Sequence, residues 1–185
     1  MRLAPIPRPA LALLLTALWP SPAAAAWPTS PTVNLPVCTA VGVQTSPAIA
    51  PDNAGGVVAA WSDYRGVSSS DIYVHHILAS GVADPAWPVN GRALCTAVSN
   101  QLGPVIAADG GGGAIVAWYD YRGGSTSDIY AQHVLATGAV DPAWPANGRG
   151  LCTASGDQLG PVIVADGSGG AIVAWYDYRG GSTSD

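Results

Sequence analysis

The stretch GGAIVAWYDYRG, residues 112–123, decides the fold of this 185-residue chain. The same twelve residues recur at 169–180, and a related stretch, GGVVAAWSDYRG, lies at 55–66. Three cysteines, Cys38, Cys95 and Cys152, keep the same spacing of 57 residues (95 − 38 = 152 − 95 = 57). A fixed period of this length indicates an array in which each unit is stable only when it packs against copies of itself.

One complete unit predicts four β-strands joined by short connections. Its apolar and β-branched runs predict strands over 101–108, 114–119, 128–135 and 149–154. Between the first two, Asp109 and four glycines predict a tight hairpin turn, because glycine accepts positive φ and aspartate hydrogen-bonds its own backbone. The predicted fold class is therefore all-β, with one four-stranded antiparallel sheet in each 57-residue repeat.

The strand at 114–119 is apolar on both faces. Ala114, Val116 and Trp118 alternate with Ile115, Ala117 and Tyr119. A strand that is apolar on both sides belongs to a sheet covered by neighbours on both faces. This is the state of a blade in a β-propeller. We therefore expect a partial β-propeller; a β-helix, helical repeats and an immunoglobulin-like domain agree less well with the period and the composition.

The sequence divides into five segments. They are a signal peptide (1–26), an N-terminal strand or linker (27–37), repeat 1 (38–94), repeat 2 (95–151) and an incomplete repeat 3 (152–185). Propellers close with typically 4 to 8 blades. We therefore expect either further C-terminal blades or self-association of an open array. We also hypothesise that the N-terminal strand completes the last blade of the ring.

The N-terminus predicts export. Arg2 and Arg8 precede a short apolar run at 10–18, and the small residues 23–26 form a cleavage site. The run is shorter than the roughly 20 residues that cross a bilayer. We expect a secreted or extracytoplasmic protein, in the periplasm or at the cell surface, with no membrane span after signal cleavage.

The composition restricts the partners. All seven basic residues are arginines, against twelve aspartates, and the formal net charge is −5. A chain without a basic cluster has no electrostatic footprint for a phosphate backbone, so nucleic acid is excluded as an expected partner. An unidentified protein or glycan is the expected partner.

The motif Trp-x-Asp-Tyr-Arg-Gly supports two interpretations. In the structural one, the arginine bridges carboxylates across the loop between the second and third strands, and the tryptophan fills the space between sheets. In the functional one, the loops form a rim that binds protein or sugar. The candidate rim residues are Asp63, Tyr64, Arg65, Asp120, Tyr121, Arg122, Asp177, Tyr178 and Arg179.

Cysteine and histidine predict no chemistry of their own. The repeated cysteines are expected to be small buried residues without disulfides, because equivalent positions are held apart by the repeat. His76 and His133 lie at equivalent strand positions and are expected to be ordinary strand residues without partners. We predict no catalytic residue, no metal site and no cofactor.

The motif at 118–123, followed by Ser-Asp-Ile-Tyr-Ala-Gln at 127–132, resembles the repeats of large secreted bacterial β-propeller proteins. The loop at 141–148 is similar to the Asp-Pro-Ser-Phe-Gly pattern of delta-60-type propeller repeats, with Trp144 in place of phenylalanine. The resemblance implies the propeller fold and transfers no catalytic residue.

Two functions remain open from the sequence. The favoured one is a non-catalytic extracytoplasmic scaffold or a binding or adhesion module. The alternative is a fragment of a propeller-type carbohydrate-active enzyme, a glycosidase or lyase, whose catalytic residues lie outside this chain.

Overall fold

The computed structural model describes residues 27–185, except 67, 182 and 184. The predicted signal peptide at 1–26 lies outside the described residues. Within the described part the regular secondary structure is ten β-strands, and no helix is present. This confirms the all-β prediction.

Two of the three sheets have four antiparallel strands. The first has the order β1 (Gln44–Pro51), β2 (Val57–Asp63), β3 (Asp71–Ile77) and β4 (Arg92–Cys95). Neighbours along the chain are therefore neighbours in the sheet.

The second sheet repeats this order with β5 (Gln101–Ala108), β6 (Ala114–Asp120), β7 (Asp128–Val134) and β8 (Arg149–Cys152). The four strands predicted from the sequence are confirmed, with ends that differ by at most two residues. Two of the three cysteines that mark the period in the sequence, Cys95 and Cys152, end a sheet here.

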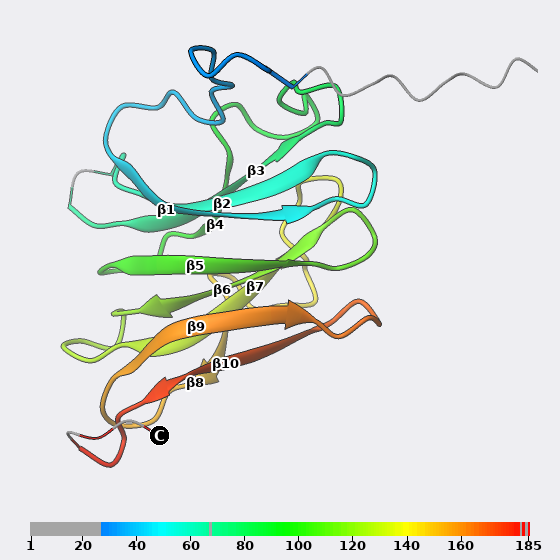
Figure 1. Ribbon diagram of the computed structural model, residues 1–185. Coiled ribbons are helices and arrows are strands. Elements are labelled where there is room, and N and C mark those ends of the chain that lie inside the picture. Colours follow the sequence, from blue (N-terminus) through cyan, green and yellow to red (C-terminus); the bar gives the residue numbers. More distant parts are fainter. Residues whose placement is uncertain (1–26, 67, 182, 184) are drawn as a thin grey trace, which may run out of the picture.

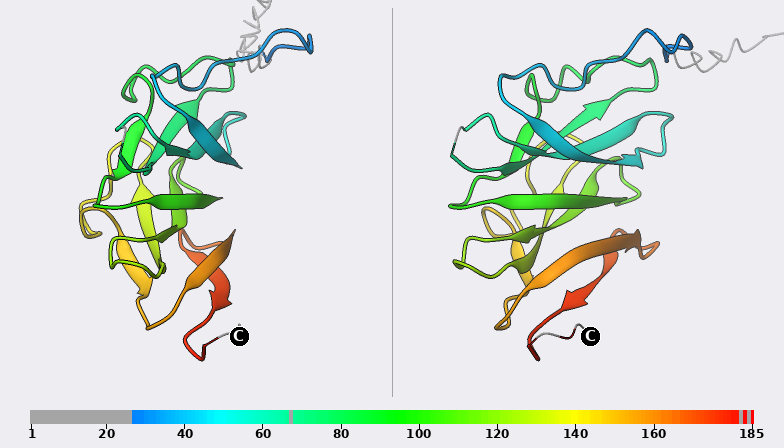
Figure 2. Two further views of the ribbon diagram at one scale, coloured as in Figure 1. Left: turned by 90° about the vertical axis from the view of Figure 1, so that its left-hand side faces the viewer. Right: turned by 60° about the vertical axis from the view of Figure 1, so that its left-hand side comes forward.

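The third sheet is the hairpin of β9 (Gln158–Ala165) and β10 (Ala171–Asp177). The three sheets stack one above another, with their first strands β1, β5 and β9 side by side (Figures 1 and 2). The hairpin turns gather at one end of the stack, and the loops that follow β2, β6 and β10 gather at the other (Figure 1).

β6 is buried on both faces, as the sequence predicts. Val116 and Trp118 pack in a cluster that includes residues of the first sheet. Ile115 and Ala117 pack in a second cluster with Ile163 and other residues of the third sheet. The second sheet is thus covered on both sides by copies of the same unit, which is how these apolar side chains avoid water.

β10 has the same seven residues as β6 but a different burial. Ile172, Ala174 and Tyr176 are exposed, whereas Ala171, Val173 and Trp175 are half-buried against the second sheet. The exposed fraction is 5% for Ile115 and 63% for the equivalent Ile172. Burial of this sequence therefore depends on whether a neighbouring sheet is present.

The pairing of each first strand with the second strand of its sheet is irregular. The pairing register shifts within β1, β5 and β9, and a proline lies at the shift in each case: Pro47, Pro104 and Pro161. Proline cannot donate a ladder hydrogen bond, and a bulge leaves the strand locally unpaired. The first strands are thus unsuited to accept another strand.

Residues 27–43 form no strand in this chain. Cys38 nevertheless takes the place relative to the first sheet that Cys95 takes relative to the second. Thr39 N donates to Asn90 Oδ1 (2.8 Å), as Thr96 N donates to Asn147 Oδ1 (3.0 Å). The segment around Cys38 therefore stands where the end of a preceding fourth strand would lie.

We predict that Trp118→Ala lowers the free energy of unfolding by about 3–5 kcal/mol, because it leaves a cavity between two sheets. Trp175→Ala is the matched control, since Trp175 occupies the equivalent but half-buried position; it is expected to cost less than about 2 kcal/mol. Urea unfolding followed by far-ultraviolet circular dichroism measures both, and equal losses would contradict the two-sided burial of β6.

Candidate functional site

The aspartate of each Trp-x-Asp-Tyr-Arg-Gly motif is the centre of a hydrogen-bonded cluster. Asp63 accepts from Trp61 Nε1 (2.7 Å), from Arg65 N (2.9 Å) and from Arg65 Nη2 (2.6 Å). Asp120 accepts from Trp118 Nε1 (2.8 Å) and from Arg122 Nη2 (2.6 Å) in the same way. Both aspartates are fully buried, so every donor comes from the protein.

The arginine of the cluster links three further groups. Arg122 Nη2 donates to the carbonyl of Asn147 (2.7 Å) and to Cys95 Sγ (3.1 Å) at the end of the preceding sheet. Its guanidinium lies over the ring of Tyr130, 3.8 Å from the centroid. Arg65 repeats this set on the first sheet. Arg122 therefore ties its own sheet to the one before it, and Arg65 ties the first sheet to the segment around Cys38.

Burial and hydrogen bonds together set the pKa values of these groups. Burial would raise the pKa of Asp63, but hydrogen bonds from Arg65 and Trp61 outweigh it and hold that pKa below its ordinary value. Burial raises the pKa of the Cys95 thiol to about 12, so the thiol stays protonated. The three cysteines are free, as the sequence predicts. Their contact with arginine was not predicted.

The prediction that each arginine bridges two carboxylates is wrong. Asp128 lies directly opposite Asp120 in the register of β6 and β7. Among the described residues it receives no hydrogen bond from Arg122, which turns toward Asn147 and Tyr130 instead. Burial and the neighbouring charge of Asp120 raise the pKa of Asp128. Asp71 repeats this arrangement opposite Asp63.

The candidate rim residues lie together at the end of the stack opposite the hairpin turns. Their accessibility differs: Asp63, Asp120 and Asp177 are buried, while Tyr64, Tyr121 and Tyr178 are half-buried. Arg65 and Arg122 are half-buried, and Arg179 is exposed. Binding at this end therefore stays a prediction that rests on the tyrosines and the arginines, because the aspartates already bind protein donors.

A second repeated cluster, which the sequence reasoning missed, lies at the other end of the sheets. His133 Nε2 is 2.9 Å from Asp109 Oδ2, and its Nδ1 is 2.8 Å from Asp141 Oδ2. His76 stands in the same way between Asp52 and Asp84, at 2.9 and 2.8 Å. The prediction that these histidines have no partners is wrong.

A signal for this cluster was available. In both units the histidine is separated by 24 residues from the first aspartate and by 8 from the second. The first aspartate also closes the hairpin turn, because Asp109 Oδ1 accepts from Gly111 N (2.7 Å) and Gly113 N (2.9 Å), as predicted. Each cluster therefore joins the hairpin turn, the third strand and the loop before the fourth strand.

The cluster at His76 also touches the next sheet. The ring of Trp87 packs at a tilt of 47° against the ring of His76, with centroids 5.8 Å apart, and Trp87 Nε1 donates to the carbonyl of Ala136 (3.3 Å). Burial would raise the pKa of Asp52, but hydrogen bonds from His76 and from the amides of Ala54 and Gly56 hold it below its ordinary value. The group is a hydrogen-bonded cluster in which both carboxylate oxygens of Asp52 already have partners.

Among the described residues, no three or more histidine, cysteine or acidic side chains are placed so that they could hold one metal ion. In the same part of the chain, no helix is long and apolar enough to span a bilayer.

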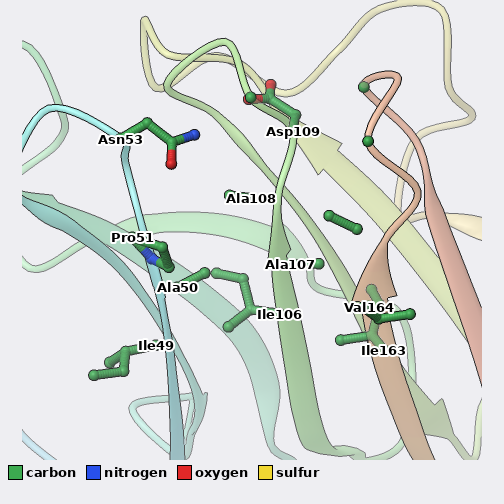
Figure 3. A pocket seen from close by; sticks show the side chains of 14 residues that line it. Ile49, Ala50, Pro51, Asn53, Ile106, Ala107, Ala108, Asp109, Ile163 and Val164 are labelled. Atoms are coloured by element: carbon green, nitrogen blue, oxygen red, sulfur yellow. The ribbon is translucent and has the colours of Figure 1, made fainter.

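A groove crosses the first strands near the hairpin turns. It has a volume of about 490 Å³, and Ile49, Ile106 and Ile163, which are repeat equivalents, contribute to its wall. Figure 3 shows Asp109 and Asn53 at the turn end of this groove and the isoleucines farther along the strands. The groove offers an apolar floor with few polar groups at its mouth.

No family model matches the sequence, and the searches of curated proteins and of solved structures give no significant match. The resemblance to delta-60-type propeller repeats therefore stays a prediction that rests on the motifs themselves.

We predict that Asp128→Asn stabilises the protein at pH 7 by a few tenths to about 1 kcal/mol, because it removes a like charge opposite Asp120. A carboxyl group whose pKa is raised in the folded state costs stability as pH rises through its titration. The gain should therefore disappear below about pH 4. Thermal unfolding at pH 7 and pH 3 checks this, and a loss at pH 7 would refute it.

We predict that Asp109→Asn costs about 1–2 kcal/mol at pH 7, because it removes the carboxylate oxygen that is hydrogen-bonded to His133 Nε2 but keeps the turn hydrogen bonds. Although burial acts in the opposite direction, hydrogen bonds lower the pKa of Asp109 in the folded state. Its contribution is complete above the unfolded value of about 3.9 and is lost as pH falls through the folded value.

The matched control for that variant is Asp166→Asn. Asp166 closes the equivalent turn in the third sheet through Ser168 N and Gly170 N, at 2.7 and 2.9 Å. It pairs with no histidine among the described residues. Its substitution should cost little at any pH, and similar losses for both variants would show that the His133 pair contributes nothing.

Proposed function

We propose that the protein is a non-catalytic extracytoplasmic scaffold of the β-propeller type, which binds a protein or glycan partner through the loops at one end of its sheets. The observation that carries this proposal is the stacking of two four-stranded antiparallel sheets and a hairpin of the same repeat, with β1, β5 and β9 side by side. In a propeller the blades surround a central channel, and the loops of successive blades converge at its rim.

The repeated chemistry supports a scaffold. Asp63 and Asp120 are fully buried, and the carboxylate of each accepts hydrogen bonds from a tryptophan and an arginine of its own sheet. An active site needs one asymmetric set of groups, whereas a structural bond is needed in every unit. The alternative, a carbohydrate-active enzyme, takes its catalytic groups from outside this chain and is favoured by no contact among the described residues.

The tyrosines that follow these aspartates support a surface for a ligand. Tyr64, Tyr121 and Tyr178 repeat at the same end of three sheets, and each keeps part of its side chain accessible. Tyr121 is held edge-on to Tyr119, with ring centroids 6.1 Å apart. Aromatic side chains with an apolar face and a polar tip are suited to sugar rings and to protein interfaces. Export through the predicted signal peptide would place this surface outside the cytoplasm.

The test is a panel of immobilised oligosaccharides probed with the purified protein. We expect saturable binding that the triple substitution of Tyr64, Tyr121 and Tyr178 by alanine weakens at least about tenfold, which corresponds to about 1.4 kcal/mol. Tyr176→Ala is the matched control, because Tyr176 is 60% exposed on β10 but lies outside the loops. Equal loss in the control would contradict a loop site, and release of new reducing ends would favour the enzyme.

A further inference from the structure

A pocket lies between the segment that precedes β1 and the loop that joins β3 to β4. Its volume is about 410 Å³, which falls within the range of small-molecule sites. Its apolar wall includes Val37, Pro85, Trp87 and Val89. Its polar side chains are those of Thr39, His75, Asp84 and Asn90. All of the residues that line it belong to the first repeat and to the segment just before it.

The most buried polar side chain of this pocket is His75. It is 3% exposed, and its Nδ1 accepts a hydrogen bond from His76 N (3.0 Å). Burial lowers the pKa of His75 from its ordinary value of about 6.5, so the ring is neutral at pH 7. A neutral ring whose Nδ1 accepts a hydrogen bond carries its proton on Nε2. Among the described residues this Nε2–H has no acceptor, so His75 is a buried donor that a ligand in the pocket can satisfy.

The second repeat has Gln132 at the equivalent position, and its amide is fully bonded. Gln132 Oε1 accepts from His133 N (3.0 Å), which repeats the hydrogen bond that His75 Nδ1 accepts. Gln132 Nε2 then donates to the carbonyl of Pro145 (2.9 Å). Histidine in place of glutamine therefore keeps the first hydrogen bond and leaves the second polar group of the side chain without a protein partner among the described residues.

The wall formed by the N-terminal segment is held in place. Thr39 N and Thr39 Oγ1 both donate to Asn90 Oδ1, at 2.8 and 3.2 Å. This wall also has a smaller side chain than its counterpart, because Val37 stands where the second repeat has Leu94, a core residue that is 2% exposed. The pocket is therefore formed before any ligand binds.

Asp84 supplies an acceptor and disfavours anions. Its side chain is 14% exposed; its Oδ1 accepts from Ala86 N (2.8 Å), and its Oδ2 lies 2.8 Å from His76 Nδ1. Each carboxylate oxygen can accept a further hydrogen bond. No lysine or arginine is among the described residues that line the pocket, so an anion would meet the charge of Asp84 without a counter-ion. The pocket therefore suits a neutral ligand that brings an acceptor for His75 and a donor for Asp84.

We propose that this pocket binds the acetamido group of a neutral N-acetylated sugar, an N-acetylhexosamine residue of a glycan. The acetamide carbonyl accepts from His75 Nε2–H, its N–H donates to Asp84, and its methyl group packs against the apolar wall at Trp87. The polar side chains of Thr39 and Asn90 bind the ring hydroxyls, which an acetylated peptide side chain lacks. The site is separate from the tyrosine surface at the loops, so either can fail alone.

The first test is a titration of the purified protein with N-acetylglucosamine and with N-acetylgalactosamine, followed in the imidazole ¹H–¹⁵N spectrum. The chain has three histidines, so each ring can be assigned by substitution. We expect the free protein to show His75 neutral with its proton on Nε2, and at least one of the sugars to shift the His75 signals saturably. The signals of His133, in the second repeat, are the control and should not move. Glucose, which lacks the acetamido group, should bind at least about tenfold more weakly.

The second test is His75→Gln, which withdraws the donor and introduces the residue that the second repeat has at this position. It should weaken binding of the N-acetylated sugar at least about tenfold. Gln132→His makes the reverse exchange in the second repeat and is the matched control; it should leave the affinity of the His75 pocket unchanged. The triple tyrosine variant of the loops should also keep this binding. The comparison with glucose in the unchanged protein decides the question if His75→Gln does not fold.

Four results would overturn the proposal. They are His75 signals that neither sugar shifts, glucose that binds as tightly as the N-acetylated sugars, an unchanged affinity in His75→Gln, and N-acetyllysine that binds more tightly than either sugar. The last result would assign the pocket to an acetylated peptide.

Discussion

The stack depends on each sheet covering the apolar face of the next. Fully burying a valine or isoleucine side chain contributes about 1.5–3 kcal/mol, and β6 buries such residues on both faces. The identical strand β10 buries only the face that meets the second sheet. Since sequence and backbone are the same, the difference lies in the neighbour. Stability in such an array therefore resides at the interfaces between units, as it does in other repeat proteins.

The hydrogen-bonded clusters around Asp63 and Asp120, at the ends of β2 and β6, follow from this burial. A buried carboxylate costs several kcal/mol unless donors surround it, and Asp120 is fully buried. Trp118 Nε1 and Arg122 supply those donors, and Arg122 then reaches Cys95 of the preceding sheet. The tryptophan thus has two roles, an apolar ring between sheets and an N–H for the carboxylate. These linked roles explain why the residues of the motif recur together and not singly.

Local patterns were sufficient to predict the strands and the turn. Alternation along 114–119 gave the two buried faces, and Asp109 with its glycines gave the hairpin. The side-chain partners were harder because they come from separate segments. His133 contacts Asp109 only when the first three strands of the sheet pair. In the sequence, only the constant separation of 24 residues between the histidine and this aspartate in both units indicated the contact.

The arginine prediction failed for a related reason. Asp128 follows Asp120 closely in sequence, which suggested a shared partner. The register of β6 and β7 places the two carboxylates directly opposite each other, and Arg122 is drawn instead to Asn147 O and the ring of Tyr130. Sequence proximity in a loop does not determine which acceptor a long side chain reaches.

The number of strands in a sheet is limited at both of its edges. At the first strand, a proline and a bulge prevent further pairing, as Pro104 does in β5. At the fourth strand, pairing ends after four residues at a cysteine that the arginine of the next sheet contacts. Growth of a sheet therefore stops at four strands, and further growth of the array is possible only by stacking. Adding strands at a sheet edge would leave the apolar faces exposed, whereas stacking another sheet buries them. The edge residues therefore favour assembly by stacking.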